Sequence, residues 1–192
     1  MKHLIACLLA ARVMSATGSS AVEPTYREVQ ATLTYGLSTP TEDWKARMEN
    51  GQSLALDLGM AVSSRATVGF HFGIGVFDAK IKQLGALNAS VDQHDWTRYS
   101  GGIFGEYRLT ASRVAPFVGA NLGVYGVHIA YDEVIEGFDG QGHFGFGFGI
   151  SAGLQYRGDQ PVGAILRFDA ENPRGVIDGW FYQAQVGLRA FL

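Results

Sequence analysis

Large apolar and small residues alternate along the segment 144–156, and this is the strongest structural signal in the chain. The even positions carry Phe144, Phe146, Phe148, Ile150, Ala152, Leu154 and Tyr156, whereas the odd positions are mainly glycine. A period of two places successive side chains on opposite faces of a β-strand. Glycine weakens a solvated strand. The pattern therefore favours a strand whose apolar face meets lipid and whose glycine face lines a narrow barrel.

The same alternation recurs along the chain and predicts eight strands in total. The predicted strands are 29–38, 53–62, 68–76, 99–109, 117–125, 144–156, 162–171 and 180–192. Long and short connections alternate between them, as in barrels with short turns at one membrane face and longer loops at the other. The fold class predicted is all-β, an eight-stranded antiparallel up-and-down transmembrane β-barrel. Aromatic residues such as Tyr35 and Tyr99 are expected at strand ends, in interfacial girdles.

Length and charge narrow the function classes. A chain of 192 residues suits one domain, and its net charge of −3 gives no argument for nucleic-acid binding. No run of 18 apolar residues exists, so no spanning helix is indicated. Lysine is confined to four positions, fewer than the outside of a soluble barrel would carry.

The N-terminus resembles a secretory signal peptide. Lys2 precedes the short apolar region 4–11, and Ser19-Ser20-Ala21 offers small residues for cleavage. We therefore predict a cleaved signal peptide at 1–21 and a barrel domain at 22–192. Cys7 is the only cysteine, so the mature chain has none.

This start fixes the predicted orientation. The mature chain begins in the periplasm, and eight spans return its end there. The longer connections, near Glu42, Asn88, Glu136 and Gly175, then face outside, and the turns at Ser64, Ser112 and Gly158 face inside.

Charged residues fall on the face opposite the apolar one. We predict an interior polar network of Asp57, His71, Glu106, Arg108, Arg167, Asp169, Glu171 and Arg189. An arginine facing lipid would cost about 2–4 kcal/mol near the midplane. An eight-stranded barrel has room inside for side chains only, and the mixture of signs favours a plugged, salt-bridged lumen. Arg167 is expected to pair with an acid such as Glu106 or Asp169.

With this pattern, residues 28–192 resemble the small outer-membrane β-barrel superfamily, in its OmpA/OmpX-like group. The last strand is similar to the family's terminal insertion signal at Gln185, Gly187, Ala190 and Leu192, although Ala190 and Leu192 stand where aromatics are usual. The resemblance implies a Gram-negative outer membrane, contacts with membrane lipid and lipopolysaccharide, the barrel-insertion machinery as a partner, and a monomer. Members include adhesins, anchors, narrow channels and a few lipid-modifying enzymes, so one fold does not fix one function.

Candidate chemistry is sparse. Lipid A deacylases of similar shape carry a His-x-Ser pair on a strand, but His71 is followed by Phe72 and Gly73. We interpret His71 as a structural residue of the lumen and predict no catalytic, metal or cofactor site. The main hypothesis is a non-enzymatic barrel whose loops serve envelope integrity, surface contact or adhesion, with a host or surface ligand as possible partner. A narrow channel for small solutes is the alternative, and a lipid A-modifying enzyme is the third.

Overall fold

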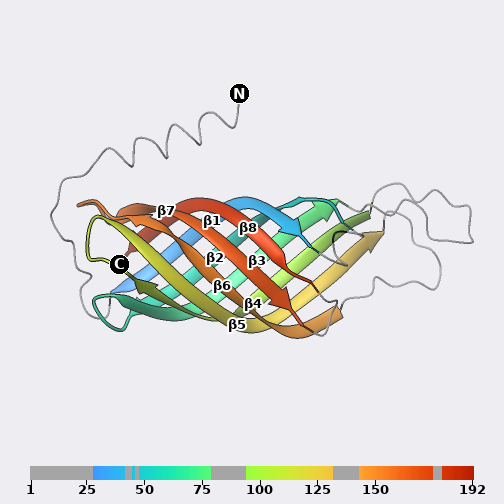
Figure 1. The fold of residues 1–192 in the computed structure, drawn as a ribbon, viewed down its shortest axis with the longest axis horizontal. Helices are drawn as coiled ribbons and strands as arrows, with labels where there is room; N and C mark the ends of the chain where they lie inside the picture. The colour runs from blue at the N-terminus through green and yellow to red at the C-terminus, as the bar shows by residue number, and fades with distance from the viewer. Residues whose placement is uncertain (1–27, 42–44, 46–47, 79–93, 132–142, 175–178) are drawn as a thin grey trace, which may run out of the picture.

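The computed structural model describes residues 28–41, 45, 48–78, 94–131, 143–174 and 179–192 (Figure 1). Eight β-strands run through them in chain order. They are β1 Val29–Pro40, β2 Gly51–Ala61, β3 Ala66–Asp78, β4 His94–Arg108, β5 Val114–Tyr131, β6 His143–Tyr156, β7 Val162–Pro173 and β8 Phe181–Phe191. The predicted signal peptide, 1–21, lies outside the described residues. No helix among the described residues is long and apolar enough to cross a membrane.

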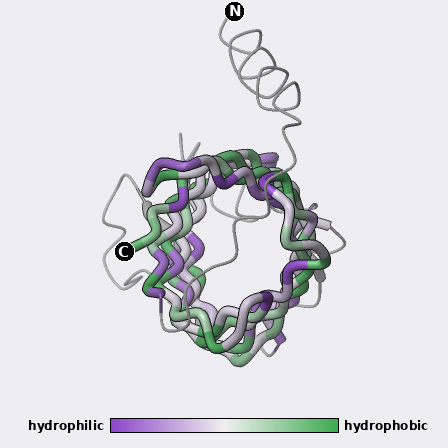
Figure 2. The backbone as a smooth tube through the Cα atoms, turned by 90° about the vertical axis from the view of Figure 1, so that its left-hand side faces the viewer, coloured by the Kyte–Doolittle hydropathy of each residue, from purple (hydrophilic) through white to green (hydrophobic). Residues whose placement is uncertain are grey.

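The strands form a closed barrel in which each strand pairs with its sequence neighbours and β1 pairs with β8 (Figure 2). The predicted fold class is confirmed. A row of paired residues that starts at Gln30 returns to β1 at Pro40, ten residues further on. The row passes through Gln30, Gly59, Gly69, Phe104, Asn121, Gly149, Glu171, Phe181 and Pro40. This offset tilts the strands, as closure of a barrel requires. Closure also leaves no unpaired strand edge in lipid.

The barrel has two different ends. We call the end with the short connections 62–65, 109–113 and 157–161 the turn end, and it also holds Glu28 and Leu192. The opposite end, where the longer connections leave the strands, is the loop end. All positions below refer to these two ends.

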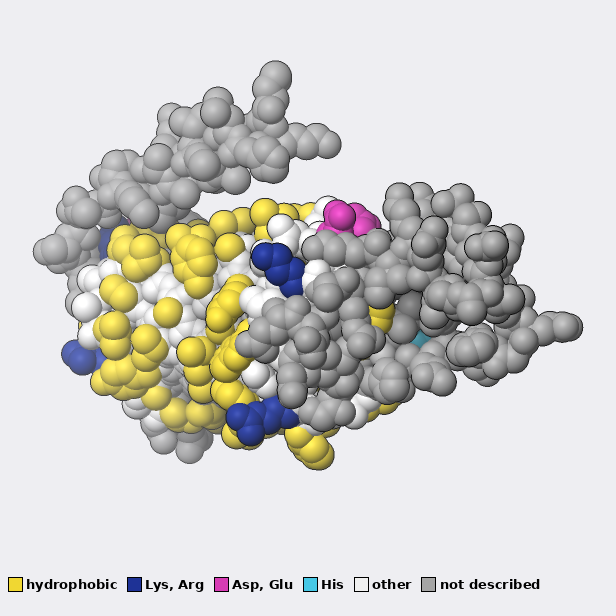
Figure 3. Space-filling model, turned by 45° about the vertical axis from the view of Figure 1, so that its right-hand side comes forward, with side chains coloured by type: hydrophobic (Ala, Val, Ile, Leu, Met, Phe, Trp, Pro, Cys, Tyr) yellow, Lys and Arg dark blue, Asp and Glu magenta, His cyan; other side chains and the backbone are white. Residues whose placement is uncertain are grey.

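Side chains alternate strictly between the lumen and the outside. In β2 every second residue is buried along the whole strand, from Gly51 to Ala61. Large apolar side chains face outward from each strand in turn: Leu33, Leu56, Phe70, Ile103, Leu122, Phe146, Phe168 and Leu188. Figure 3 shows such side chains spread over the barrel wall. Among outward positions whose side chains are described, only Asp78 and His128 are acidic or basic, both near the loop end. This apolar belt is the surface that a lipid bilayer requires.

Glycines on the inner face allow the wall to curve tightly. A Cβ atom at Gly36 would collide with the carbonyl oxygen of Ala184, and one at Gly69 with that of Leu58. These glycines therefore cannot be replaced without moving a neighbouring strand. The steric requirement explains the glycine face of the predicted strands.

Two strands extend at least five residues beyond their predicted bounds at the loop end. β4 begins at His94 rather than 99, and β5 continues to Tyr131, so His128 lies in a strand and not in a loop. The reason is that β4 and β5 keep pairing beyond the region of apolar alternation, up to the pair His94 and Tyr131. In consequence Tyr99 lies inside β4, and Tyr35 lies inside β1, which continues to Pro40. These two residues therefore lie further from the strand ends than the predicted bounds placed them, whereas Phe144 and Tyr156 lie within one residue of the ends of β6.

Candidate functional site

The lumen is the one region where charged residues gather inside the described part of the barrel. Asp57, His71, Glu106, Arg108, Arg167, Asp169, Glu171 and Arg189 are all buried there. Strand periodicity explains their shared orientation, since each occupies an inward position of its strand. Together with Arg98, which is also buried, the strands bring four carboxylates and four guanidinium groups into the lumen. The buried charge is therefore balanced.

The central layer is built around Arg167. Its Nε donates to Asp169 Oδ1 at 2.6 Å, and its Nη1 donates to Asp57 Oδ2. Asp57 also binds His71, whose Nδ1 lies 2.6 Å from Asp57 Oδ1. The side chains involved are at most 5% exposed. Arg167 thus holds two acids in place, one from two residues further along β7 and one from β2 across the barrel.

A second layer lies on the loop side of the first. Arg98 Nη1 donates to Glu171 Oε2 at 2.5 Å, and Gln183 Nε2 donates to the same oxygen at 2.7 Å. Gln185 continues the network by donating to Gln183 Oε1 at 2.9 Å and to Ser53 Oγ at 3.0 Å. The hydrogen bonds tie β4 and β7 to β8 and β2 across the lumen.

A third layer lies towards the turn end. Arg189 donates through Nη1 and Nη2 to both oxygens of Glu106, at 2.5 and 2.7 Å. It also donates to Gln155 Oε1 at 2.5 Å and to Thr32 Oγ1 at 2.8 Å. This fork of bonds is the geometry in which an arginine and a carboxylate interact most strongly.

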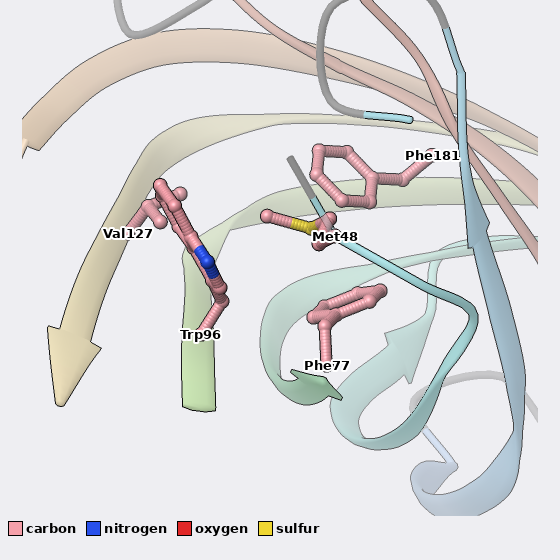
Figure 4. Packing of buried hydrophobic residues seen from close by; sticks show 5 residues of the cluster. All are labelled: Met48, Phe77, Trp96, Val127 and Phe181. Atoms are coloured by element: carbon pink, nitrogen blue, oxygen red, sulfur yellow. The ribbon is translucent and has the colours of Figure 1, made fainter. Parts of the chain in front are cut away.

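Five buried apolar side chains pack together inside the barrel near the loop end, and we call them the apolar cap (Figure 4). It consists of Met48, Phe77, Trp96, Val127 and Phe181, all buried. Phe77 and Phe181 meet edge to face with ring centroids 5.4 Å apart. Met48 belongs to the connection after β1, which is held against the barrel where the Glu49 amide donates to the Asp78 carbonyl at 2.8 Å. The cap meets the charged layers where the Arg98 guanidinium lies 4.7 Å from the centroid of the Phe181 ring.

Aromatic rings and an ion pair close the turn end. Phe117 and Phe191 are buried, and the Arg157 guanidinium lies 4.2 Å from the centroid of the Phe191 ring. Arg157 also donates to Glu28 Oε2 at 3.0 Å. Arg108, the remaining inward arginine, donates to the backbone carbonyl of Ser64 in a turn. Both ends of the charged layers are thus covered by side chains.

One set of side chains in the lumen, Asp57, His71 and Ser100, is arranged in the carboxylate–imidazole–hydroxyl order of a hydrolytic triad. His71 contacts Asp57 through Nδ1, and its Nε2 lies 3.3 Å from Ser100 Oγ. The same Nε2 lies 3.6 Å from Glu171 Oε1. Acyl transfer needs space for a carbonyl carbon beside the hydroxyl, but the space bordered by His71, Ser100 and Tyr125 has no room for a water molecule. The arrangement can relay hydrogen bonds, and it has no place for a substrate.

Sequence reasoning missed Ser100 and Arg98 as partners in this network. Both lie at inward positions of β4, so the alternation along that strand could have predicted that they face the lumen. Their partners lie on β3 and β7, and no sequence spacing connects these strands to β4. Arg167 does bind Asp169, as expected, whereas the alternative partner Glu106 binds Arg189 instead.

The predicted insertion signal spans both faces of β8. Gln185 is buried and accepts a hydrogen bond from Thr34 Oγ1 at 2.8 Å. Leu192 is exposed beyond the strand end, and Ala190 faces outward with it. The role of the four residues of this signal in membrane insertion stays a prediction. The described residues hold no group of three His, Cys, Asp or Glu side chains placed to bind a metal.

Comparison with known proteins finds likeness in structure. No protein-family model and no curated protein sequence matches the chain. Neisserial surface protein A is similar with a TM-score of 0.60 and 16% identity, over 91% of this chain and 99% of that one. Ail, the attachment invasion locus protein of Yersinia pestis, is similar with a TM-score of 0.56 and 12% identity, over 88% of this chain and 100% of that one. The N-terminal β-barrel domain of Pseudomonas aeruginosa OprF has a TM-score of 0.50 and 12% identity, over the same shares. The chain therefore has the fold of the small eight-stranded outer-membrane β-barrels, and its apolar belt fits that membrane.

Proposed function

We propose that this protein is a closed, non-conducting outer-membrane barrel that displays its longer connections for contact at the cell surface. The observation that carries the proposal is the filled lumen. Three layers of ion pairs and hydrogen bonds cross it, and an apolar cap covers them at the loop end. A barrel whose interior transports nothing and holds no substrate leaves its loops as the part that can act on other molecules.

The charged layers favour a plug over the alternative of a narrow channel. Each arginine of the three layers contacts at least one carboxylate, and these side chains are nearly inaccessible. Breaking a buried ion pair by removing one partner typically costs about 3–5 kcal/mol. Passage of a solute would require several such pairs to open together.

The buried Ser100 argues against the alternative of a lipid A-modifying enzyme. Its hydroxyl faces the lumen, away from the bilayer in which a lipid substrate lies. The space beside Ser100 cannot hold a water molecule. We therefore assign His71 a structural role, binding Asp57 within the central layer.

The names of two similar proteins support a surface role. One is called a surface protein and the other an attachment invasion locus protein, whose structure is also known with the heparin analogue sucrose octasulfate. Together the longer connections, 41–50, 79–93, 132–142 and 174–180, carry nine acidic and five basic residues, unlike the basic loops of a binder of polyanions. The connection 132–142 carries Asp132, Glu133, Glu136 and Asp139 and no lysine or arginine. Because like charges repel, we expect a partner that is not a sulfated polysaccharide.

The proposal includes the orientation predicted from the connections. The turn end faces the periplasm, the signal peptide 1–21 is removed, and the barrel is a monomer surrounded by lipid and lipopolysaccharide. Gln185, Gly187, Ala190 and Leu192 serve the insertion machinery. Cysteine labelling tests the orientation, because the mature chain has no cysteine. Ala89→Cys should react with an impermeant maleimide on intact cells, and Ser64→Cys only after the outer membrane is breached. The reverse pattern would invert the topology.

Loop replacement tests the surface role. Bacteria that produce the wild-type barrel are compared, for adherence to cultured epithelial cells, with bacteria whose four longer connections are replaced by glycine-serine segments of equal length. Met48 and Glu49 are kept in the first connection, because both contact the barrel. The barrel strands are unchanged, so both proteins should show the heat-dependent gel shift of a folded barrel. We expect adherence to fall to the level of cells without the protein. Equal adherence of the two strains would contradict a role for the loops in attachment.

A further inference from the structure

The outer wall of the barrel carries a groove that the proposed surface role does not use. Its volume is about 720 Å³, and it lies across the outward faces of β2, β3, β4 and β5. Leu58, Met60, Val68, Phe70, Ile103 and Leu122 line its sides. Phe70, Ile103 and Leu122 are each about 60% exposed, so they project beyond the wall around the groove.

Two small residues make up the lowest part of this groove. Gly105 and Ala120 face outward and pair with each other across β4 and β5. A Cβ atom at Gly105 would have no other atom within 4 Å, in contrast to the inward glycines. Glycine is unfavourable in a strand interior unless something approaches its backbone closely. Nothing in the barrel does so at Gly105, so the wall there is open to a group from outside the chain.

The groove lies in the half of the apolar belt nearest the turn end. Met60 and Val68 pair with each other, one position before the end of β2 and two positions after the start of β3. The turn that joins these strands carries Arg65, whose side chain is exposed. Arg65 lies beyond the groove lining, so a molecule that fills the groove and extends past the ends of β2 and β3 would contact apolar side chains first and a cation after them.

We propose that this groove is a binding site for one glycerophospholipid. An acyl chain lies over Gly105 and Ala120, and the phosphate of the same lipid interacts with Arg65. A flexible chain can reach the lowest part of the groove between the projecting side chains, whereas the rigid wall of a second barrel cannot. The positive charge at the membrane surface complements a phosphate. The orientation proposed above places Arg65 at the periplasmic face, so the bound lipid belongs to the periplasmic leaflet, and this assignment rests on that orientation.

Photo-cross-linking tests the site. The protein is reconstituted in vesicles of phosphatidylethanolamine and phosphatidylglycerol that contain a phospholipid with a diazirine on its acyl chain. After illumination, mass spectrometry maps the labelled residues. We expect labels to concentrate on the groove residues of β3, β4 and β5. Both leaflets of these vesicles hold the same lipids, so the result does not depend on orientation, and failure here is distinct from failure of the proposed function.

Matched variants assign the labels to the groove. Gly105→Leu fills the groove and should lower groove labelling about tenfold, the loss expected when burial of about two methylene groups is removed. Gly101→Leu is the control, because Gly101 faces outward on the same strand, outside the groove, with its nearest neighbour Phe72 at 3.9 Å from a Cβ. It should leave groove labelling unchanged. Arg65 lies in a turn, so Arg65→Gln should not disturb folding. It therefore tests the site even if Gly105→Leu does not fold. It should lower labelling to a smaller extent.

Three outcomes would overturn the proposal. Labels spread over all eight strands in proportion to exposed apolar area would indicate bulk lipid only. Equal effects of Gly105→Leu and Gly101→Leu would show that filling the groove is irrelevant. Cross-links between two copies at Gly105 in place of lipid labels would make the groove an interface between barrels.

Discussion

The centre of the lumen and its loop-end cap fill the same barrel by opposite chemistry. At the centre, Arg167 binds two carboxylates that would be costly to bury alone. In the cap, Met48, Phe77 and Phe181 pack through apolar side chains, and the Arg98 guanidinium contacts only the Phe181 ring at the inner side. Charged side chains join strands across the middle of the lumen. Apolar packing fills the lumen at the loop end, where it keeps water out. The two regions should therefore respond differently to the same kind of substitution.

The largest effect is expected at the centre. Arg167→Leu leaves the Asp57 and Asp169 carboxylates without their cation, and should lower the free energy of unfolding by about 3–5 kcal/mol. Urea unfolding in detergent or vesicles, followed by tryptophan fluorescence, measures the change. Arg174→Leu is the control, because Arg174 is exposed and lies 5.5 Å from the Phe148 ring centroid, a contact of about 0.5–1 kcal/mol. Equal effects would show that Arg167 is not part of a closed interior.

A double substitution separates charge from packing in the layer near the turn end. Arg189→Met alone should cost about 3 kcal/mol, because Glu106 stays buried without a cation. Adding Glu106→Leu removes that charge too, and should recover most of the loss. The remainder reflects Gln155 and Thr32, which lose a donor. If the double variant is the sum of two losses, the penalty does not come from an unpaired charge.

In the cap, size should matter more than chemistry. Met48→Ala removes a buried side chain and should cost about 2 kcal/mol, at the low end for such changes because Met48 lies outside the strands. Met48→Leu conserves volume and should cost less than about 1.5 kcal/mol. The same urea titration compares them. A loss for Met48→Leu as large as that for Arg167→Leu would contradict the contrast between the two regions.

The smallest effect is expected at Ser100. Ser100→Ala removes a 3.3 Å contact with His71, which keeps its hydrogen bond to Asp57, so stability should fall by less than about 1 kcal/mol. Mass spectrometry of lipid A from cells that produce wild type and Ser100→Ala should give the same species. A lipid A product that disappears with Ser100→Ala would make the group of Asp57, His71 and Ser100 catalytic.

The fold was predictable because alternation with a period of two survives in every strand. Where the apolar alternation stops, as at the loop end of β5, the sequence gives no sign that backbone pairing continues to Tyr131. The barrel wall is thus specified by side-chain pattern, while the extensions beyond the membrane belt depend on backbone hydrogen bonds that any residue can make.

The partners within the lumen were predictable only in part. Alternation shows that Glu171 and Ser100 point inward, but the ion pair of Arg98 with Glu171 joins residues 73 positions apart. That contact depends on the register between successive strands around the closed barrel, and no local sequence pattern predicts this register. Met48 was missed for another reason, since it lies in a polar stretch and reaches the cap through the path of its connection.

Ion conductance tests the closed lumen most directly. The purified wild-type barrel, shown to be folded by its gel shift, is added to a planar lipid bilayer, with a water-filled porin measured in the same membrane as a control. The three charged layers and the cap predict no stepwise conductance from this protein. Stable, reproducible conductance steps that change in size with Arg167→Leu would contradict the closed lumen and make the barrel a narrow channel.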